Sequence, residues 1–452
     1  MVSEKPLVNV LWFKKDLRLS DHQPLKEAIE TDLPLLLLFV FEPSIRKYPD
    51  WNIRHWLFQY YSLQNLNENL AKYQAKILIY YGEVKDVFEH LTLHFQIQNV
   101  FSHQETGTKI TFDRDILMAN FLEEQKIVWK EYGANGVQRG KKTKKNLTKA
   151  WLEMLQEPFQ NPDLPKLKAV DFEIDIAFWA DYKTSRQFEN YPKTFQSAGE
   201  KSAWLALRNF VKNHTKKNVK SVAEPIKKTF SNSQISPYLT YGNLTSKQVF
   251  QFFKSKFKDS EQKNLDNFRL RLQWRFGCIQ KFEDQNFLEF ENLNATENIA
   301  KSLNIKYLQA WKDAKTGFPL VDACMRCVQE TGFLNNKMRA LLVSFLTQNL
   351  QQDWRTGVHF LAQQFLDYEP AIHFLYFQMQ AGTAENSKLK IYNPRKKLID
   401  KDFDSVFIKK WIPELKNVPS NLIYEPYKMT VLEQEFYQCL IGKTYPKPIL
   451  DK

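Results

Sequence analysis

Cysteine is scarce in this chain of 452 residues, which has four: Cys278, Cys324, Cys327 and Cys439. So few cysteines in a chain of this length do not make a disulfide framework. Cys324 and Cys327 have C-x-x-C spacing, but they lie inside a segment predicted to be helical, and no second pair is nearby. We therefore expect no metal or redox centre at these residues.

Glycine is also infrequent, with 13 residues, and no G-x-G-x-x-G motif is present. A dinucleotide fingerprint of that type is therefore not supported. No apolar run is long enough to cross a bilayer, and the polar start of the chain, residues 1–6, does not resemble a signal peptide. We expect a soluble, cytoplasmic protein that does not associate with membranes.

Basic and aromatic residues are abundant. Lys and Arg number 64 against 51 Asp and Glu, which gives a net charge of +13. A basic surface of this size favours an anionic partner such as DNA, although a generally basic soluble protein has the same composition. Aromatic residues make up 14% of the chain, enough for ring stacking or electron hopping as well as core packing.

Short apolar runs alternate with helical patterns in the first third of the chain. The helical patterns include 53–74 and 112–125, and the runs predict buried strands at 7–13, 34–41, 75–81, 97–102 and 126–132. This alternation is typical of a parallel sheet covered on both faces. We predict a Rossmann-like α/β domain over 1–132, a linker over 133–200 and a mainly α-helical domain over 201–452, in agreement with the two domains expected from chain length.

The most informative segment is 316–383. Apolar residues at helical spacing between Met338 and Leu350 predict a buried helix that starts at Asn335–Asn336. A second helical run follows residues 353–355 and breaks at Asp367-Tyr368-Glu369-Pro370. Two acids in a three-residue turn are costly to bury unpaired, so they are either solvated at a surface turn or face a polar ligand.

An ordered set of motifs resembles the photolyase/cryptochrome family over nearly the whole chain. The set comprises VLWFKKDLRLSDHQPL (10–25), SQISPYLTYGNLT (233–245), RLRLQWR (269–275), TGFPLVDA, TGF-x-x-NxxxR, DWR-x-G, D-x-E, AGT, IYNPRKKLIDKDFDSVFIKKWIPEL (391–415) and IYEPYKMT (423–430). The resemblance implies that the α/β domain is an antenna domain and that the helical domain binds FAD. Lys14, Lys15, Asp16 and Arg18 follow the first strand, where open sheets bind ligands, and with Glu105 they are candidate ligands of a folate or deazaflavin antenna.

The resemblance also implies an FAD site in the helical domain. The diphosphate would be wrapped by Asn232, Ser233, Gln234, Ile235 and Ser236, although a helix start with Ser236 as cap and Pro237 in the first turn fits the same residues. Arg271, Trp274 and Arg275 share one helix face, and the family match directs it toward FAD and the substrate. Around the flavin ring the resemblance implies an Arg339–Asp367 ion pair, with Asn336, Glu369 and His373 nearby.

Several positions depart from the family pattern. Arg271 stands where dimer photolyases usually have Glu, and an alternative for it is a surface salt bridge. His373 matches the position facing flavin N5, where it would be a proton donor or, alternatively, a core histidine satisfied by the backbone. Phe377 replaces the flavin-proximal tryptophan of the usual electron-transfer triad, which leaves Trp354, with Tyr376, Trp274 or Trp311 as another route. Met379 replaces a tryptophan that packs on the lesion.

The resemblance implies a blue-light-driven DNA photolyase that repairs UV-induced pyrimidine dimers as a monomer. The candidate catalytic residues are Arg271, Trp274, Asn336, His373 and Met379, and the candidate DNA contacts are Lys337, Arg395, Lys396 and Lys397. The lesion would be flipped out toward the flavin. The alternatives are a cryptochrome photoreceptor without repair activity, which the departures above favour, and a flavin-binding module that uses neither light nor DNA.

Overall fold

The computed structural model describes residues 5–140, 146–172, 188–215, 234–257, 262–294, 303–384, 389–396, 398 and 401–450. The N-terminal part is a five-stranded parallel sheet with strand order β3-β2-β1-β4-β5. Its strands are β1 (Leu7–Phe13), β2 (Leu35–Phe41), β3 (Leu78–Tyr81), β4 (Gln96–His103) and β5 (Val128–Tyr132). The order reverses between β1 and β4, so the sheet is the open, doubly wound type that was predicted.

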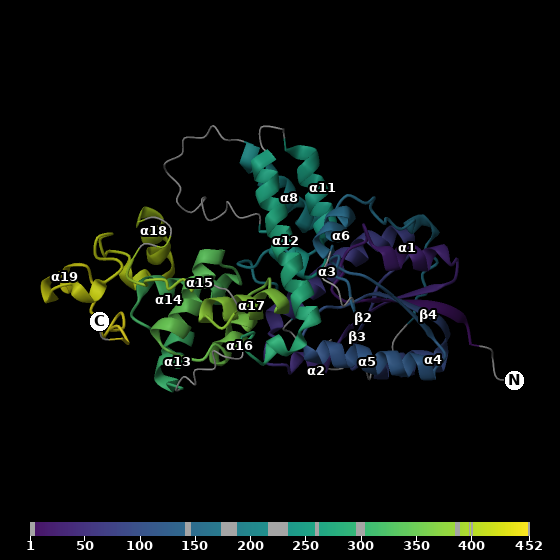
Figure 1. The fold of residues 1–452 in the computed structure, drawn as a ribbon, viewed down its shortest axis with the longest axis horizontal. Coiled ribbons are helices and arrows are strands. Elements are labelled where there is room, and N and C mark those ends of the chain that lie inside the picture. The colour runs from purple at the N-terminus through teal and green to yellow at the C-terminus, as the bar shows by residue number, and fades with distance from the viewer. Residues whose placement is uncertain are drawn as a thin grey trace.

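The apolar runs of β1 and β2 are continuous because both faces of the sheet are covered there. The edge strand β5 has no buried residue, so its prediction as a buried strand was wrong. Alternate residues of β2 enter different cores: Leu37 and Phe39 pack on one side, and Leu36 and Leu38 on the other. Figure 1 shows α1 on one side of the sheet and α4 and α5 on the other. The helices of this part are α1 (Gln23–Glu30), α2 (Pro43–Arg46), α3 (Ile53–Leu70), α4 (Val84–His94) and α5 (Lys109–Glu124).

The rest of the chain is helical, as predicted. Its helices are α8 (Glu200–Thr215), α10 (Ser236–Thr240), α11 (Ser246–Lys256), α12 (Gln262–Asp284), α13 (Ile305–Lys312), α14 (Pro319–Thr331), α15 (Asn336–Ser344), α16 (Arg355–Gln364), α17 (Pro370–Ala381), α18 (Lys401–Trp411) and α19 (Val431–Phe436). The helix predicted to run to Leu350 changes at Phe345–Asn349 into a π-helical turn. Figure 1 shows the long helix α12 between the sheet and helices α13–α18.

The predicted linker contains a helix that belongs to a core. Helix α6 (Leu147–Met154) buries Trp151, whose ring stacks on Phe276 of α12 with centroids 5.4 Å apart. The core that covers one face of the sheet therefore continues into the helical part through α6, α8, α11 and α12.

The two parts are also joined at Gly242. The backbone N–H of Leu17 donates to the carbonyl of Tyr241 at 3.0 Å, and Arg18 Nη1 donates to the carbonyl of Gly242 at 3.0 Å. A Cβ atom on Gly242, whose φ is +68°, would lie 2.2 Å from the carbonyl oxygen of Lys15. Glycine is therefore required at position 242, both for the backbone conformation and for the close approach of this segment to the loop after β1. Among the described residues, no helix is long and apolar enough to span a membrane.

Candidate flavin site

Most residues assigned to the flavin ring line one pocket. They come from α12, α15, α17 and the turn before α17, which are far apart in sequence. The lining residues include Trp274, Asn336, Arg339, Asp367, Glu369, His373, Tyr376 and Phe377. Arg271 is not among them, although it lies one turn from Trp274 and Arg275 on α12.

Local sequence explains how these side chains are placed. Helix α15 begins as predicted, because the Asn335 side chain caps it by accepting from the N–H of Met338 at 3.0 Å. Asn336 and Arg339 then lie in its first turn. Helix α16 ends at Gln364, and Pro370 starts α17 in its first turn, so residues 365–369 are a short connection with a turn that carries Asp367 and Glu369 into the pocket.

Both acids of this connection are buried and paired with arginine. Asp367 is 9% exposed, and both of its oxygens accept from Arg339 Nη2 at 2.7 Å, which is the predicted ion pair. Glu369 is 5% exposed and accepts from Arg275 Nη2 at 2.7 Å. The solvated-turn alternative is therefore wrong. The Arg275–Glu369 pair was not foreseen, although the assignment of both residues to one ligand was a signal for it.

The surroundings of the pocket have unused hydrogen-bonding capacity. Arg275 is buried, and its Nε has no hydrogen-bond partner among the described residues. A larger cavity of about 790 Å³ is lined by residues that include Gln234 and Phe333. The Arg339 guanidinium lies 6.0 Å from the centroid of Phe333, so it links the two spaces. A buried donor without a partner fits a polar, anionic ligand such as a dinucleotide.

The environment of His373 is that of a core histidine satisfied by the backbone, which was one of the two alternatives for it. Its Nε2 lies 2.8 Å from the carbonyl oxygen of Val358. A carbonyl can only accept, so Nε2 carries the proton and Nδ1 has the lone pair. Burial lowers the pKa of His373 to about 3, so the ring is neutral near pH 7. With its N–H used on Val358, His373 is arranged to accept a hydrogen bond rather than to donate a proton.

The two candidate electron-transfer residues lie at different depths. Tyr376 lines the pocket, and its hydroxyl donates to the carbonyl of Asn336 at 2.6 Å. Trp354 is buried outside the pocket, where its Nε1 donates to Asn292 at 2.8 Å. Its ring meets Phe374 edge-on at 6.3 Å, and Phe374 lies 6.0 Å from His373. Two rings that are hard to oxidise, Phe374 and Phe377, therefore stand where a hopping route would pass.

The residues assigned to the lesion and to DNA are mostly exposed. Trp274 is 43% and Met379 37% exposed. Arg271 is exposed and forms no ion pair within 4.0 Å among the described residues, so the surface salt bridge considered for it is not seen there. Lys337 and Lys396 are exposed as well. Arg395 differs, because it is half-buried with its guanidinium over the ring of Phe318 at 5.3 Å.

Part of the diphosphate segment can be placed. Asn232 and Ser233 lie outside the described residues, as does Lys397. The backbone carbonyl of Gln234 accepts a hydrogen bond from the Gln196 side-chain amide, and Ile235 is buried. Helix α10 starts at Ser236 with Ile235 in the cap position and no side-chain cap. The expectation that Ser236 is the cap was therefore wrong, whereas Pro237 does lie in the first turn.

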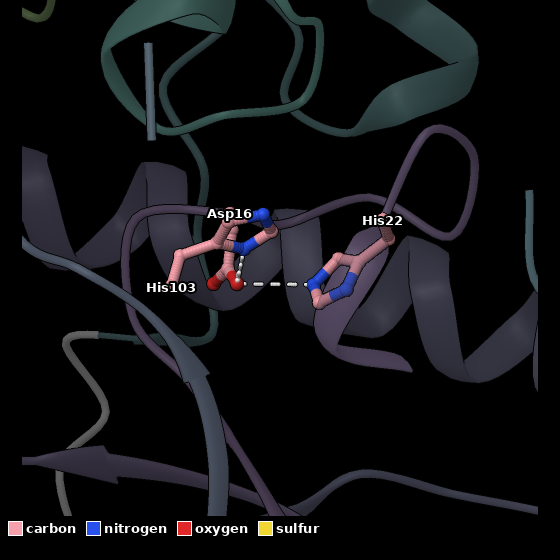
Figure 2. A group of neighbouring side chains, drawn as sticks. All are labelled: Asp16, His22 and His103. Carbon is pink, nitrogen blue, oxygen red and sulfur yellow. Dashed lines mark hydrogen bonds and ion pairs between the residues drawn. The ribbon is translucent and has the colours of Figure 1, made fainter. Parts of the chain in front are cut away.

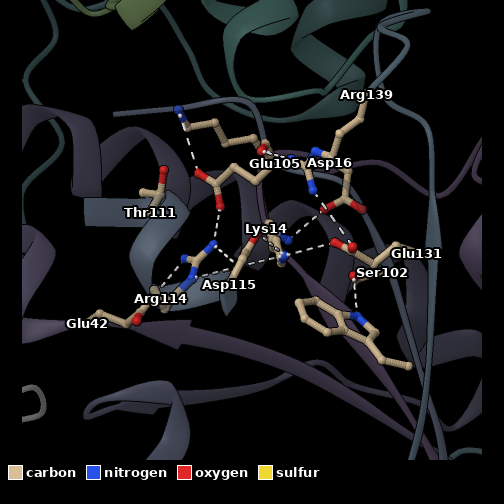
Figure 3. Close-up of polar contacts among 12 residues, drawn as sticks. Lys14, Asp16, Glu42, Ser102, Glu105, Thr111, Arg114, Asp115, Glu131 and Arg139 are labelled. Carbon is tan, nitrogen blue, oxygen red and sulfur yellow. Dashed lines mark hydrogen bonds and ion pairs between the residues drawn. The ribbon is translucent and has the colours of Figure 1, made fainter. Parts of the chain in front are cut away.

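Two candidate antenna residues, Lys14 and Glu105, belong to an ion-pair network around Arg114 (Figure 3). Arg114 binds Glu42 at 2.8 Å, Glu105 at 2.6 Å and Asp115 at 2.8 Å. Lys14 binds Asp115 at 2.9 Å, and its ammonium lies 4.2 Å from the ring centroid of Trp12. Burial raises the pKa of Glu42 to about 7 despite the charge of Arg114. Lys14 and Glu105 thus have partners within the protein, and the antenna remains a prediction.

Asp16 forms a separate buried cluster with two histidines (Figure 2). Its Oδ2 lies 2.7 Å from His103 Nδ1 and 3.0 Å from His22 Nε2. The N–H of Leu25 donates to His22 Nδ1 at 3.1 Å, so the proton of neutral His22 is on Nε2. That nitrogen has no lone pair for a metal. Burial opposes ionisation of Asp16, but the neighbouring histidines outweigh it and hold the pKa of its carboxyl well below its usual value.

The C-x-x-C pair lies in α14 with both cysteines buried. Burial raises the pKa of Cys327 to about 11 and that of Cys324 well above its usual value. Thiols with raised pKa values are poor metal ligands and nucleophiles.

A parallel sheet joined to a helical domain, with two Arg–carboxylate pairs whose acids line one pocket, is the architecture of a two-domain flavoprotein. The family model for DNA photolyase matches residues 9–155, and the model for the FAD binding domain of DNA photolyase matches residues 268–452. The chain belongs to the photolyase/cryptochrome family.

Some of the relatives are named photolyases and others cryptochromes. The chain is 26% identical over 98% of its length to the deoxyribodipyrimidine photo-lyase of Alkalihalophilus pseudofirmus, covering 95% of that protein. It is 24% identical over 99% of its length to cryptochrome DASH of Synechocystis sp., covering 96% of it. It superposes on a bacterial class III photolyase from Agrobacterium tumefaciens with a TM-score of 0.81 at 21% identity, covering 100% of this chain and 95% of that one.

Proposed function

We propose that this protein is an FAD-dependent, blue-light-driven DNA photolyase that repairs UV-induced pyrimidine dimers. The observation that carries the proposal is the convergence of two buried Arg–carboxylate pairs on one pocket, with the exposed Trp274 at its edge. Paired charges of this kind hold the polar edge of a flavin ring, and an exposed indole offers a face on which a base can stack.

The residues fit FAD in a specific arrangement. Gln234, Ile235 and Ser236 would contact the diphosphate, with Arg275 Nε as a charged donor toward it. Arg339, Asp367, Glu369 and Asn336 would surround the ring. When bound, FAD supplies the light-excited electron that splits the dimer.

The DNA contacts would come from exposed side chains of the helical domain. Lys337 and Lys396 are exposed cations that can bind phosphate. Arg271 can donate to a phosphate or to a base carbonyl, but it cannot accept a hydrogen bond as a glutamate would. Trp274 and Met379 would contact the flipped bases, with the indole as the stacking wall. The net charge of +13 supports binding that weakens steeply with salt.

The direct test is repair of a defined lesion. The purified, reduced protein is mixed with an oligonucleotide that carries one cyclobutane pyrimidine dimer, illuminated with blue light, and lesion loss is followed by chromatography. Light-dependent loss is expected, and a dark sample is the control. No loss from a protein that holds photoactive FAD would contradict dimer repair, and the same assay on the pyrimidine–pyrimidone photoproduct would then test that second lesion.

The second candidate function is a cryptochrome photoreceptor without repair activity. Arg271, His373, Phe377 and Met379 favour it, because each departs from the dimer-photolyase pattern. Binding separates the two functions. A photolyase should prefer lesion-bearing DNA over the same undamaged duplex at several salt concentrations, whereas a photoreceptor need show no such preference.

A further inference from the structure

A buried hydrogen bond joins the α/β domain to the flavin pocket. Asp50 lies between α2 and α3 and is 0% exposed. The Tyr368 hydroxyl donates to Asp50 Oδ2 at 2.5 Å, across 318 residues of sequence. Tyr368 lines the pocket and stands between Asp367 and Glu369, the two acids of the Arg–carboxylate pairs. One side chain of the α/β domain therefore holds the middle residue of the acidic turn.

The backbone leading to this turn rests on the same part of the α/β domain. Arg54 Nη1 donates to the carbonyl of Gln364 at 2.5 Å, and Gln363 Nε2 donates to the carbonyl of Pro49 at 2.8 Å. His55 Nε2 lies 3.0 Å from the carbonyl oxygen of Phe365, to which it donates. Residues 363–368 are thus bound along the start of α3 by these four hydrogen bonds, and Asp50–Tyr368 is the last of them before the pocket.

The aromatic packing transmits the position of Tyr368. Its ring stacks on His55 with centroids 5.8 Å apart and meets His373 edge-on at 5.2 Å. Asp367 and Glu369 flank Tyr368, and Asp367 makes its pair 2.7 Å from Arg339. Because three consecutive residues share two peptide planes, a shift of the phenol would displace both carboxylates.

The chemistry of Asp50 is not that of a purely stabilising residue. Its Oδ1 is buried and has no hydrogen-bond partner among the described residues. A carboxyl with one unsatisfied buried oxygen costs free energy, and a neutral acceptor would bind the Tyr368 hydroxyl without that cost. Retention of a costly polar group next to a site is typical of a positional role.

We propose that Asp50 is a positioning residue of the flavin site, which acts through Tyr368 to hold Asp367 and Glu369 against the flavin ring. The proposal rests on the assignment of FAD to this pocket in the proposed function. It makes the loop before α3, on the α/β domain, part of the machinery that binds the flavin.

The experiment measures FAD affinity of the full chain, by titrating FAD into flavin-depleted protein and following flavin fluorescence and the shape of the visible absorption band. The variants are Asp50→Ala and Tyr368→Phe, which remove the bond, and Asp50→Asn, which keeps an acceptor. The matched control is Tyr445→Phe, because Tyr445 donates to the buried Asp322 at the same 2.5 Å away from the pocket.

We expect Asp50→Ala and Tyr368→Phe to weaken FAD binding at least tenfold and to alter the absorption band. Asp50→Asn should stay within about threefold of the parent protein, and Tyr445→Phe should leave affinity unchanged while lowering the unfolding temperature. If Tyr368→Phe bound FAD as well as Tyr445→Phe does, or if Asp50→Asn lost as much affinity as Asp50→Ala, the proposal would be overturned. Affinity is measured without DNA or repair, so a parent protein that binds FAD but repairs no lesion counts against the proposed function alone.

Discussion

The Arg339 side chain makes several contacts that hold the pocket together. It binds both oxygens of Asp367, donates from Nε to the carbonyl of Leu334 at 3.0 Å, and lies 3.9 Å from the ring centroid of Phe365. Arg339→Gln would leave the Asp367 carboxylate buried without its counter-ion. We expect a loss of about 3–5 kcal/mol in the free energy of unfolding, measured by urea denaturation, together with loss of bound FAD.

The control for this substitution is a more exposed arginine–carboxylate pair on the same domain. Arg326 binds Glu414 through two bonds of 2.9 Å, but the side chains are 26% and 31% exposed. Arg326→Gln should cost about 1 kcal/mol or less, because water can solvate the remaining carboxylate. Equal losses in the two variants would show that burial of Asp367 is not what makes its pair important.

His373 shows how burial changes the chemistry of a residue whose ordinary pKa suggested a proton donor. Because burial lowers its pKa to about 3, we expect its ring to stay neutral between pH 5 and 8. Nitrogen NMR of the labelled histidine side chains should show no titration of His373 in that range. A titration midpoint near 6.5 would contradict the assigned hydrogen bond to Val358.

At the scale of elements, the regular structure followed from local pattern. The strands were predictable because continuous apolar runs of four to eight residues between helical patterns suit a sheet buried on both faces. The start of α15 was predictable because Asn335 is a strong cap. The π-helical turn after Ser344 was not, since apolar spacing alone does not distinguish it from a continuing helix.

Contacts between distant segments were harder to predict. The Arg339–Asp367 pair came from the family resemblance, whereas Arg275–Glu369 and Asp50–Tyr368 join residues 94 and 318 positions apart and have no local signature. A surface position was one of the two alternatives for Arg271, and the sequence did not decide between them, because one face of a helix spans both the pocket and its rim. Tertiary packing decides such partners, and a single sequence carries that information only indirectly.

The junction at Gly242 gives a prediction about how elements dock. Gly242→Ala would place a Cβ 2.2 Å from the Lys15 carbonyl at a φ of +68°, so the chain before α11 must move away from the loop after β1. We expect a destabilisation of roughly 2–4 kcal/mol, from backbone strain and lost packing at the domain junction. Thermal and urea unfolding would measure it.

Gly277 is the matched control, since it lies in α12 and an added Cβ would meet nothing within 4 Å. Gly277→Ala should stabilise the protein by about 0.5–1 kcal/mol through helix propensity. If Gly242→Ala lowers the free energy of unfolding and Gly277→Ala raises it, the close approach at Gly242 is confirmed as the cause of the destabilisation. No change in the free energy of unfolding of Gly242→Ala would contradict it.

For the whole molecule, burial creates groups with opposing effects on stability as pH changes. His55 and His373 have pKa values lowered to about 3, so the unfolded chain takes up their protons first as pH falls below about 6.5 and the folded state loses stability. Asp50 and Glu42 have pKa values raised to about 7, so the folded state keeps protons that the unfolded chain releases between about pH 4 and 7. These acids add stability on acidification and partly offset the histidines.

Asp50→Asn separates the two contributions. Burial raises the Asp50 pKa to about 7, with Glu289 adding to the shift and Tyr368 and Lys15 opposing it. The parent protein therefore loses stability relative to the variant as pH rises through 4 to 7, because only the parent must ionise a buried carboxyl. The difference in unfolding free energy, variant minus parent, should grow from near zero at pH 4 to on the order of 2–4 kcal/mol at pH 8. Denaturant titrations at pH 5, 6, 7 and 8 would measure it, and a difference that does not change with pH would mean that Asp50 is already ionised throughout this range.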